Sequence, residues 1–101
     1  QATTVPQRLR LHSQLAELYL ESGQLDAALK LYKETLHLDP RNPLIWHKIS
    51  LVYWRMEDVE EADRANQQSL RLGNLAAAQQ LAEQIKAKRR GDSGLLGLFK
   101  R

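Results

Sequence analysis

The sequence predicts an all-α fold, built from two repeated helix pairs and one further helix. Apolar residues recur at intervals of three and four, which is the spacing of one face of an α-helix. Gly, Pro and Asn residues separate five such stretches, and the connections between them are short. No stretch alternates apolar and polar residues as a half-buried β-strand would, so an all-helical domain is indicated.

The first helix pair is expected after a flexible lead-in at residues 1–7, which show no periodicity. The first helix begins at Arg8 and ends before Gly23, which favours a turn. Its apolar stripe consists of Leu11, Leu15, Leu18 and Tyr19. The second helix ends before Asp39, because the residue preceding a proline is pushed out of the helical region. Its stripe consists of Leu25, Ala28, Leu29, Tyr32 and Leu36.

The second helix pair opens at Asn42 and Pro43, a cap residue followed by a proline in the first turn. The stripe of this third helix is Trp46, Ile49 and Tyr53, and the helix breaks near Glu57. The fourth helix carries Val59, Ala62, Ala65, Ser69 and Leu70 and ends at 73–74. A fifth helix is expected over 75–90, stopped by Gly91, with Ala78, Leu81, Ala82 and Ile85 on one face.

The two helix pairs repeat each other with a shift of 34 residues. The shift places Leu15 on Ile49, Tyr19 on Tyr53, Leu25 on Val59, Ala28 on Ala62, Leu36 on Leu70 and Leu38 on Leu72. Small residues at Ala16, Ser50, Ala28 and Ala62 let antiparallel helices approach closely. The space beside them is expected to be filled by the large residues Leu15, Tyr19, Trp46 and Tyr53. Since neither pair buries its stripe alone, the pairs are expected to stack.

With this period the chain resembles the tetratricopeptide repeat (TPR) family. The first repeat, residues 9–42, matches the family pattern at Leu15, Tyr19, Gly23, Ala28, Tyr32 and Pro40, and the second, residues 43–76, at Trp46, Ile49, Tyr53 and Ala62. The chain departs from the family pattern at His12, Ala16, Thr35, Ser50, Glu57, Asn66 and Asn74. The resemblance implies a right-handed α-solenoid over residues 8–90, closed by a capping helix at 75–90.

Composition and motifs argue against catalysis, so we expect no enzyme, no cofactor and no metal site. The chain has no cysteine, and its three histidines, His12, His37 and His47, are scattered over different helices. Acidic residues gather where the fourth helix begins, which the helix dipole explains. There is no apolar run of transmembrane length and no signal peptide at the start. We expect a soluble domain, with a cytoplasm-like compartment favoured, and membrane association possible through sequence that is missing.

The family resemblance implies a partner-binding groove lined by the first helix of each pair. At these positions the chain has Glu17, Leu20, Leu44, His47, Lys48, Leu51, Trp54 and Arg55. Trp54 and Leu51 are the expected anchors, with Lys48 and Arg55 setting the charge. The alternative for Trp54 is packing against a third helix pair, the N-terminal arm or a missing repeat. Some TPR proteins hold a C-terminal carboxylate in a Lys/Asn clamp, and Ser13 and Glu17 do not match it.

The C-terminal tail, residues 91–101, is apolar and basic. Its apolar residues, expected to make a contact, are Leu95, Leu96, Leu98 and Phe99. The tail is expected to fold back on its own domain or a neighbour's groove, to dock on a partner protein, to touch an anionic membrane, or to be disordered. Nucleic acid is not expected, because the basic cluster is short.

The sequence thus predicts a protein-interaction module that binds a partner peptide or helix. The alternatives are a homo-oligomeric domain that assembles through its tail or its open first-helix face, and an adaptor domain of a membrane-associated assembly factor.

Overall fold

The computed structural model describes the backbone of residues 4–73 and 75–99 and the side chains of residues 4–73 and 75–91. Helices α1 (Val5–Glu21) and α2 (Leu25–Leu38) form the first pair, and α3 (Pro43–Arg55) and α4 (Val59–Gly73) the second. The last helix, α5 (Ala76–Phe99), follows directly. No strand occurs among the described residues, which confirms the all-α fold.

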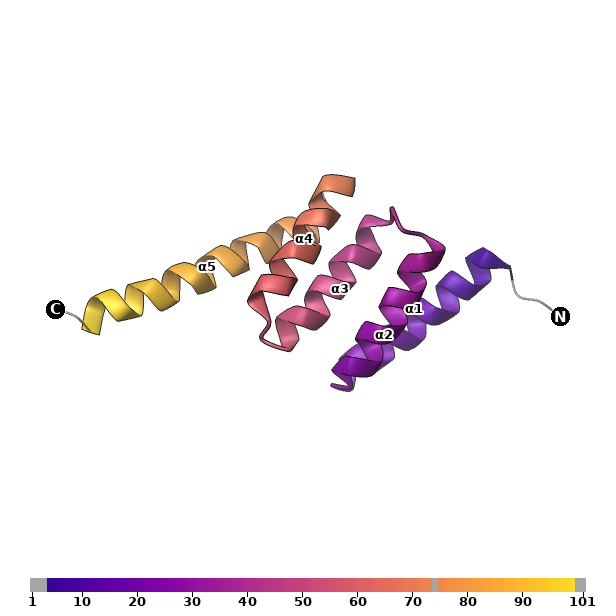
Figure 1. Ribbon diagram of the computed structural model, residues 1–101, viewed down its shortest axis with the longest axis horizontal. Helices are drawn as coiled ribbons and strands as arrows, with labels where there is room; N and C mark the ends of the chain where they lie inside the picture. Colours follow the sequence, from indigo (N-terminus) through magenta and orange to yellow (C-terminus); the bar gives the residue numbers. More distant parts are fainter. Residues whose placement is uncertain (1–3, 74, 100–101) are drawn as a thin grey trace.

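The helices stack in chain order, each packing against the helix before and after it. Figure 1 shows the two pairs side by side and α5 extending past α4. The molecule is therefore elongated, with extents of 67 × 27 × 17 Å. This arrangement is the predicted α-solenoid, in which stability comes from contacts between neighbouring elements.

The start of α1 differs from the expectation of a flexible lead-in up to residue 7. Thr4 caps the helix: its hydroxyl accepts from the Gln7 backbone N–H at 3.2 Å, and the Gln7 side chain accepts from the Thr4 N–H at 2.9 Å. Pro6 lies in the first turn, where a missing N–H costs nothing. The helix therefore begins at Val5, and residues 1–3 lie outside the described part.

Equivalent tight turns join the helices of each pair. Gly23 has a φ of +83°, the left-handed conformation that glycine adopts at no steric cost. In the second repeat, Glu57 takes the same conformation with a φ of +63°. A side chain there costs about 1–2 kcal/mol. The turn geometry is thus kept although the glycine is not.

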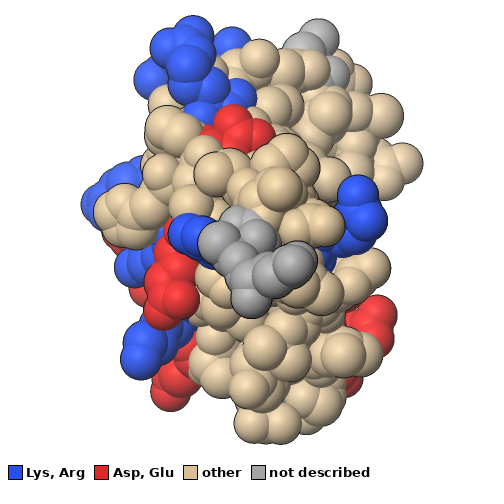
Figure 2. Space-filling model, turned by 90° about the vertical axis from the view of Figure 1, so that its right-hand side faces the viewer, with Lys and Arg blue, Asp and Glu red and all other residues tan. Residues whose placement is uncertain are grey.

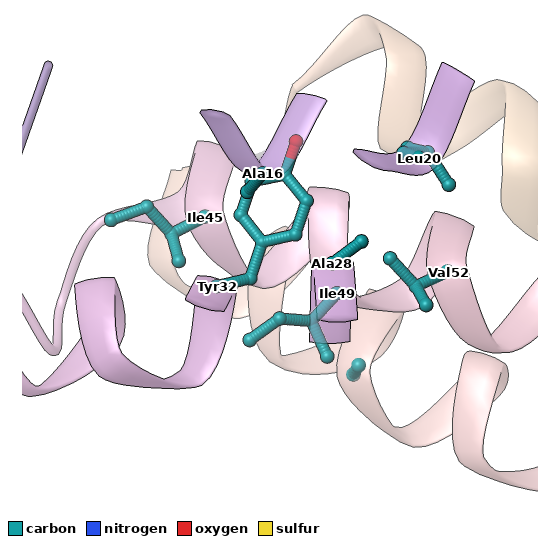
Figure 3. Packing of buried hydrophobic residues seen from close by; sticks show 8 residues of the cluster. Ala16, Leu20, Ala28, Tyr32, Ile45, Ile49 and Val52 are labelled. Atoms are coloured by element: carbon teal, nitrogen blue, oxygen red, sulfur yellow. The ribbon is translucent and has the colours of Figure 1, made fainter. Parts of the chain in front are cut away.

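The core lies between the two helix pairs (Figure 3). Ala16, Ala28, Ser50 and Ala62 are fully buried, as predicted for close helix approach. The buried larger residues are Leu20, Tyr32, Ile45, Ile49 and Val52.

The expectation that Leu15 fills this core is wrong. Leu15 is 43% exposed, and Leu11 and Leu18 are exposed too. The inward side of α1 carries Ala16 and Leu20 instead, so one helix has apolar residues on two sides.

Helix α5 continues beyond its expected end at Gly91. Gly91 has no left-handed backbone and remains helical, and the helix runs to Phe99. A glycine inside a helix costs about 1 kcal/mol relative to alanine, which does not stop a helix by itself. The backbone of the expected tail therefore continues in line with α5 and does not fold back on its own domain (Figure 1). The tail side chains Leu95, Leu96, Leu98 and Phe99 lie outside the described side chains.

Candidate functional site

A groove lies between α1 and α3, the first helices of the two pairs. It holds a cavity of about 220 Å³. The walls come from Leu9, Arg10, Ser13 and Glu17 of α1, from Leu44, Ile45 and Lys48 of α3, and from Asn42 and Tyr32 beneath. The groove is thus lined by apolar side chains, by charged groups of both signs and by neutral hydrogen-bond donors.

An ion pair joins the two walls of the groove. Lys48 Nζ lies 3.2 Å from Glu17 Oε1, and both side chains remain partly exposed. Such exposed pairs contribute about 0–1 kcal/mol, because water solvates both charges well. The pair is therefore weak enough to open when a ligand offers either group a better partner.

Tyr32 of α2 lies at the base of the groove with an unsatisfied hydroxyl. The residue is 2% exposed, and its hydroxyl has no hydrogen-bond partner in the described structure. Burial, together with the negative charges of Glu17 and Glu21, raises the pKa of Tyr32 to about 12. The hydroxyl is therefore protonated at neutral pH and keeps a proton to donate.

The predicted groove residues do not all lie in one place. Glu17, Leu44 and Lys48 line the α1–α3 cavity as expected. Arg55, at the end of α3, donates from Nη1 to the Leu20 carbonyl at 2.8 Å and so ties the end of α1 to α3. Arg55 does not line the cavity, so its expected role in setting the charge of the groove stays a prediction.

The expectation that Leu20 and His47 face the groove is wrong. Leu20 is 7% exposed and belongs to the core between the pairs. His47 is 4% exposed, and its Nδ1 lies 3.2 Å from Asn66 Oδ1 of α4. Asn66 Nδ2 donates in turn to the Ala78 carbonyl of α5 at 2.8 Å, so this polar chain links three helices. Burial lowers the pKa of His47, against the opposing effect of its hydrogen bond to Asn66.

Leu51 and Trp54 pack towards α5. Both contact the small cluster of Ala62, Leu81 and Ile85 and remain partly exposed. The 34-residue shift explains the position of Trp54, because Leu20, its equivalent in α1, is covered by the following pair in the same way. This packing supports the alternative of contact with a further helix, while a role in partner binding stays a prediction.

The structure has a second, larger cleft that the sequence did not predict. It has a volume of about 680 Å³ and lies between α2 and α4 with α3 as its floor. Its apolar lining consists of Leu36, Trp46, Ile49, Tyr53 and Ala65. Lys33 lies over the Tyr53 ring at 5.8 Å from its centroid. The cleft depends on the separation of α2 and α4, which no local pattern encodes.

The described residues include no cluster of three or more His, Asp or Glu side chains arranged to hold a metal ion. Within the same part of the chain, no helix combines the length and the apolarity needed to cross a membrane.

The fold and its groove define the class of molecule as a helical-repeat interaction domain, and comparison with known proteins gives the family. A sequence model described as TPR repeat matches residues 16–57, from the middle of α1 to the turn after α3. Together with the 34-residue repeat and the stacked helix pairs, this match, which covers less than half of the chain, identifies TPR repeats in the chain. The TPR family is a family of protein-interaction scaffolds.

Two known proteins show the extent of the similarity. Over 69 residues the chain is 35% identical to the general transcriptional corepressor ssn6 of Schizosaccharomyces pombe. The match covers 66% of this chain and 6% of that protein, so the chain spans a small part of its relative. The fold resembles the first TPR domain of Spaghetti (RPAP3) bound to the HSP90 peptide SRMEEVD, with a TM-score of 0.65 and 22% identity. That match covers 79% of this chain and 74% of the other.

Proposed function

We propose that the α1–α3 groove binds a peptide segment of a partner protein. The observation that carries the proposal is the unpartnered, buried Tyr32 hydroxyl at the base of the groove. A buried donor without a partner costs about 1–3 kcal/mol. The Tyr32 hydroxyl has less than 1 Å² of accessible surface, so a ligand carbonyl would supply the missing acceptor once the side chains that cover the hydroxyl move aside. A peptide backbone offers such a carbonyl at every residue.

The size of the groove favours a peptide over a compact small molecule. Its cavity of about 220 Å³ is smaller than the roughly 300–1,000 Å³ of typical small-molecule sites. It suits one or two side chains of a segment laid along the helices. An apolar side chain would contact Leu9, Leu44 and Ile45, while Arg10 and Lys48 provide charged hydrogen-bond donors.

The bound peptide of the Spaghetti domain does not define the ligand here. That peptide, SRMEEVD, ends in acidic residues and a carboxylate. In this groove Glu17 adds negative charge, and Ser13 and Glu17 do not match a Lys/Asn carboxylate clamp. We therefore propose an internal peptide segment with an apolar anchor residue, and we expect SRMEEVD to bind poorly.

The test is to select peptides from a random display library and to titrate one selected peptide by calorimetry. Tyr32→Phe removes only the hydroxyl, so we expect affinity to fall about fivefold to tenfold, which corresponds to one lost hydrogen bond. We expect the free energy of unfolding to stay the same or to rise slightly, because an unsatisfied polar atom is removed.

Tyr53→Phe, on the opposite cleft, is the matched control and should leave affinity unchanged. Selected peptides that bind Tyr32→Phe as tightly as the unmodified chain would contradict the proposed role of the hydroxyl. Loss of binding in Tyr53→Phe would assign the peptide to the larger cleft.

A further inference from the structure

The cleft between α2 and α4 takes no part in the proposed peptide site. Its lining shares no residue with the cavity of the α1–α3 groove. Helices α2 and α4 both pack against α3, and Figure 1 shows α3 lying between them. The volume of the cleft, about 680 Å³, lies within the roughly 300–1,000 Å³ of typical small-molecule sites. The cleft is therefore large enough to hold a small molecule.

Two aromatic side chains of α3 line the floor of this cleft. Trp46 and Tyr53 both remain partly exposed, although they pack against the core between the helix pairs. The indole N–H of Trp46 donates to the Pro40 carbonyl at 3.0 Å, which holds the ring in one orientation. A flat aromatic ligand gains by stacking on such a fixed ring, beyond the apolar area that it covers.

The charged residues that line the cleft leave one positive charge without a counter-ion. Glu61 and Arg64 of α4 form an ion pair with each other. Lys33 of α2 forms no ion pair within the described part of the chain, and its ammonium group lies over the Tyr53 ring. An aromatic ring attracts a cation but leaves its charge in place. The lining therefore favours a ligand with one negative charge.

Uncharged surface alone does not indicate such a ligand. Figure 2 looks onto the end of the molecule that holds α1 and shows charged side chains gathered mainly along one edge, beside a broad uncharged surface. The α2–α4 cleft differs, because it combines a bounded volume, two aromatic rings and an ammonium group without a counter-ion. These features together specify the size, the shape and the charge of a ligand.

We propose that this cleft binds a small aromatic carboxylate. Its flat apolar body lies against Trp46 and Leu36, and its carboxylate accepts a hydrogen bond from the Lys33 ammonium group. Arg64, on the α4 side of the cleft, is already paired with Glu61, so the carboxylate is expected on the α2 side.

The test is a titration of the isotope-labelled full chain with 2-naphthoate, followed by NMR. We expect a dissociation constant on the order of 0.1–1 mM, in keeping with the small size of this probe. The indole N–H signal of Trp46 should shift until the cleft is saturated, whereas the signal of Trp54, which packs towards α5, should stay in place. An unshifted Trp46 signal, or equal shifts of both tryptophans, would overturn the proposal.

A neutral probe and a neutral side chain test the role of Lys33. We expect 2-naphthalenemethanol, which has a hydroxyl group instead of the carboxylate, to bind about fivefold more weakly than 2-naphthoate. Lys33→Met should weaken the binding of 2-naphthoate by about the same factor and leave the binding of the alcohol unchanged. Lys86→Met removes the same charge from α5, away from the cleft, and should change neither affinity. Equal affinity of the unmodified chain for the two probes would show that the site does not select a carboxylate and would overturn the proposal.

The peptides selected for the α1–α3 groove provide a further comparison. A selected peptide should leave both the Trp46 signal and the affinity for 2-naphthoate unchanged, because the two cavities share no lining residue. A peptide that shifts the Trp46 signal and displaces 2-naphthoate would show that the cleft serves a protein partner, and the assignment to a small molecule would then be wrong.

Discussion

At the scale of single residues, two buried polar side chains differ in whether they have a hydrogen-bond partner. Tyr32 has a hydroxyl without a partner beside the groove, whereas His47 is hydrogen-bonded to Asn66. Because Asn66 Nδ2 donates to the Ala78 carbonyl, its Oδ1 accepts, and His47 Nδ1 must carry the proton. His47 is thus a neutral structural residue that joins α3 to α4.

The lowered pKa of His47 predicts a loss of stability in mild acid. The unfolded chain takes up a proton near the ordinary histidine pKa of about 6.5, while the folded chain resists it. The unfolded state then binds more protons, so the free energy of unfolding falls as pH falls through about 6.5 and levels off below the lowered pKa of the folded state.

We expect urea unfolding at a series of pH values between about 8 and 4 to show this fall. In His47→Gln the fall should be smaller. Equal pH dependence in the two proteins would mean that His47 does not contribute to it.

At the scale of helices, one glycine allows two elements to meet. A Cβ atom placed on Gly73, at the end of α4, would lie 2.5 Å from Cγ of Pro43, at the start of α3. Ser69 reinforces this approach by donating to the Pro43 carbonyl at 2.7 Å. The glycine that the sequence analysis used as a helix stop is therefore also a packing requirement.

Gly73→Ala should lower the free energy of unfolding by about 1–3 kcal/mol, because the added methyl group forces α3 and α4 apart. Gly91→Ala is the control, since nothing lies within 4 Å of a Cβ there. Helix propensity favours alanine by about 1 kcal/mol at both sites. A stabilised Gly73→Ala, measured by denaturant unfolding, would show that the Pro43 ring moves aside freely.

At the scale of the whole molecule, stability depends on the contacts between helices that follow each other in the chain. Each helix contacts mainly the one before and after it, so no central element holds all five together. In such an array, a substitution at one helix interface destabilises mainly the two helices that form that interface. Helix α5 rests on the second pair through Leu81 and Ile85, with Trp54 and Leu51 beside them.

Trp54→Ala should therefore loosen α5 more than α1. We expect a loss of about 2–3 kcal/mol, less than for a fully buried tryptophan, because the side chain is partly exposed. Amide hydrogen exchange should quicken in α4 and α5 and change little in α1 and α2. Uniform quickening along the chain would instead indicate that the domain unfolds as one cooperative unit.

Much of the architecture follows from the sequence by itself. The apolar spacing and the turns at Gly23 and Asn42 placed α2, α3 and α4 within a residue or so of their bounds, because helix signals are local. The 34-residue repeat determined the stacking, since matching residues must bury matching surfaces. The groove residues Glu17, Leu44 and Lys48 were expected from the resemblance to the TPR family, in which the first helices of the pairs line the groove.

Only the tertiary structure decided which face of each helix is covered. Leu15 and Leu20 are equally apolar, yet one is exposed and the other buried, because α1 has a neighbouring pair on one side only. His47 is interior because it hydrogen-bonds to Asn66 of α4, which in turn donates to Ala78 of α5, and the Tyr32 hydroxyl is buried where no polar group of the described residues reaches it. Periodicity determines that a helix has an apolar face, but a face is covered only where another element packs against it.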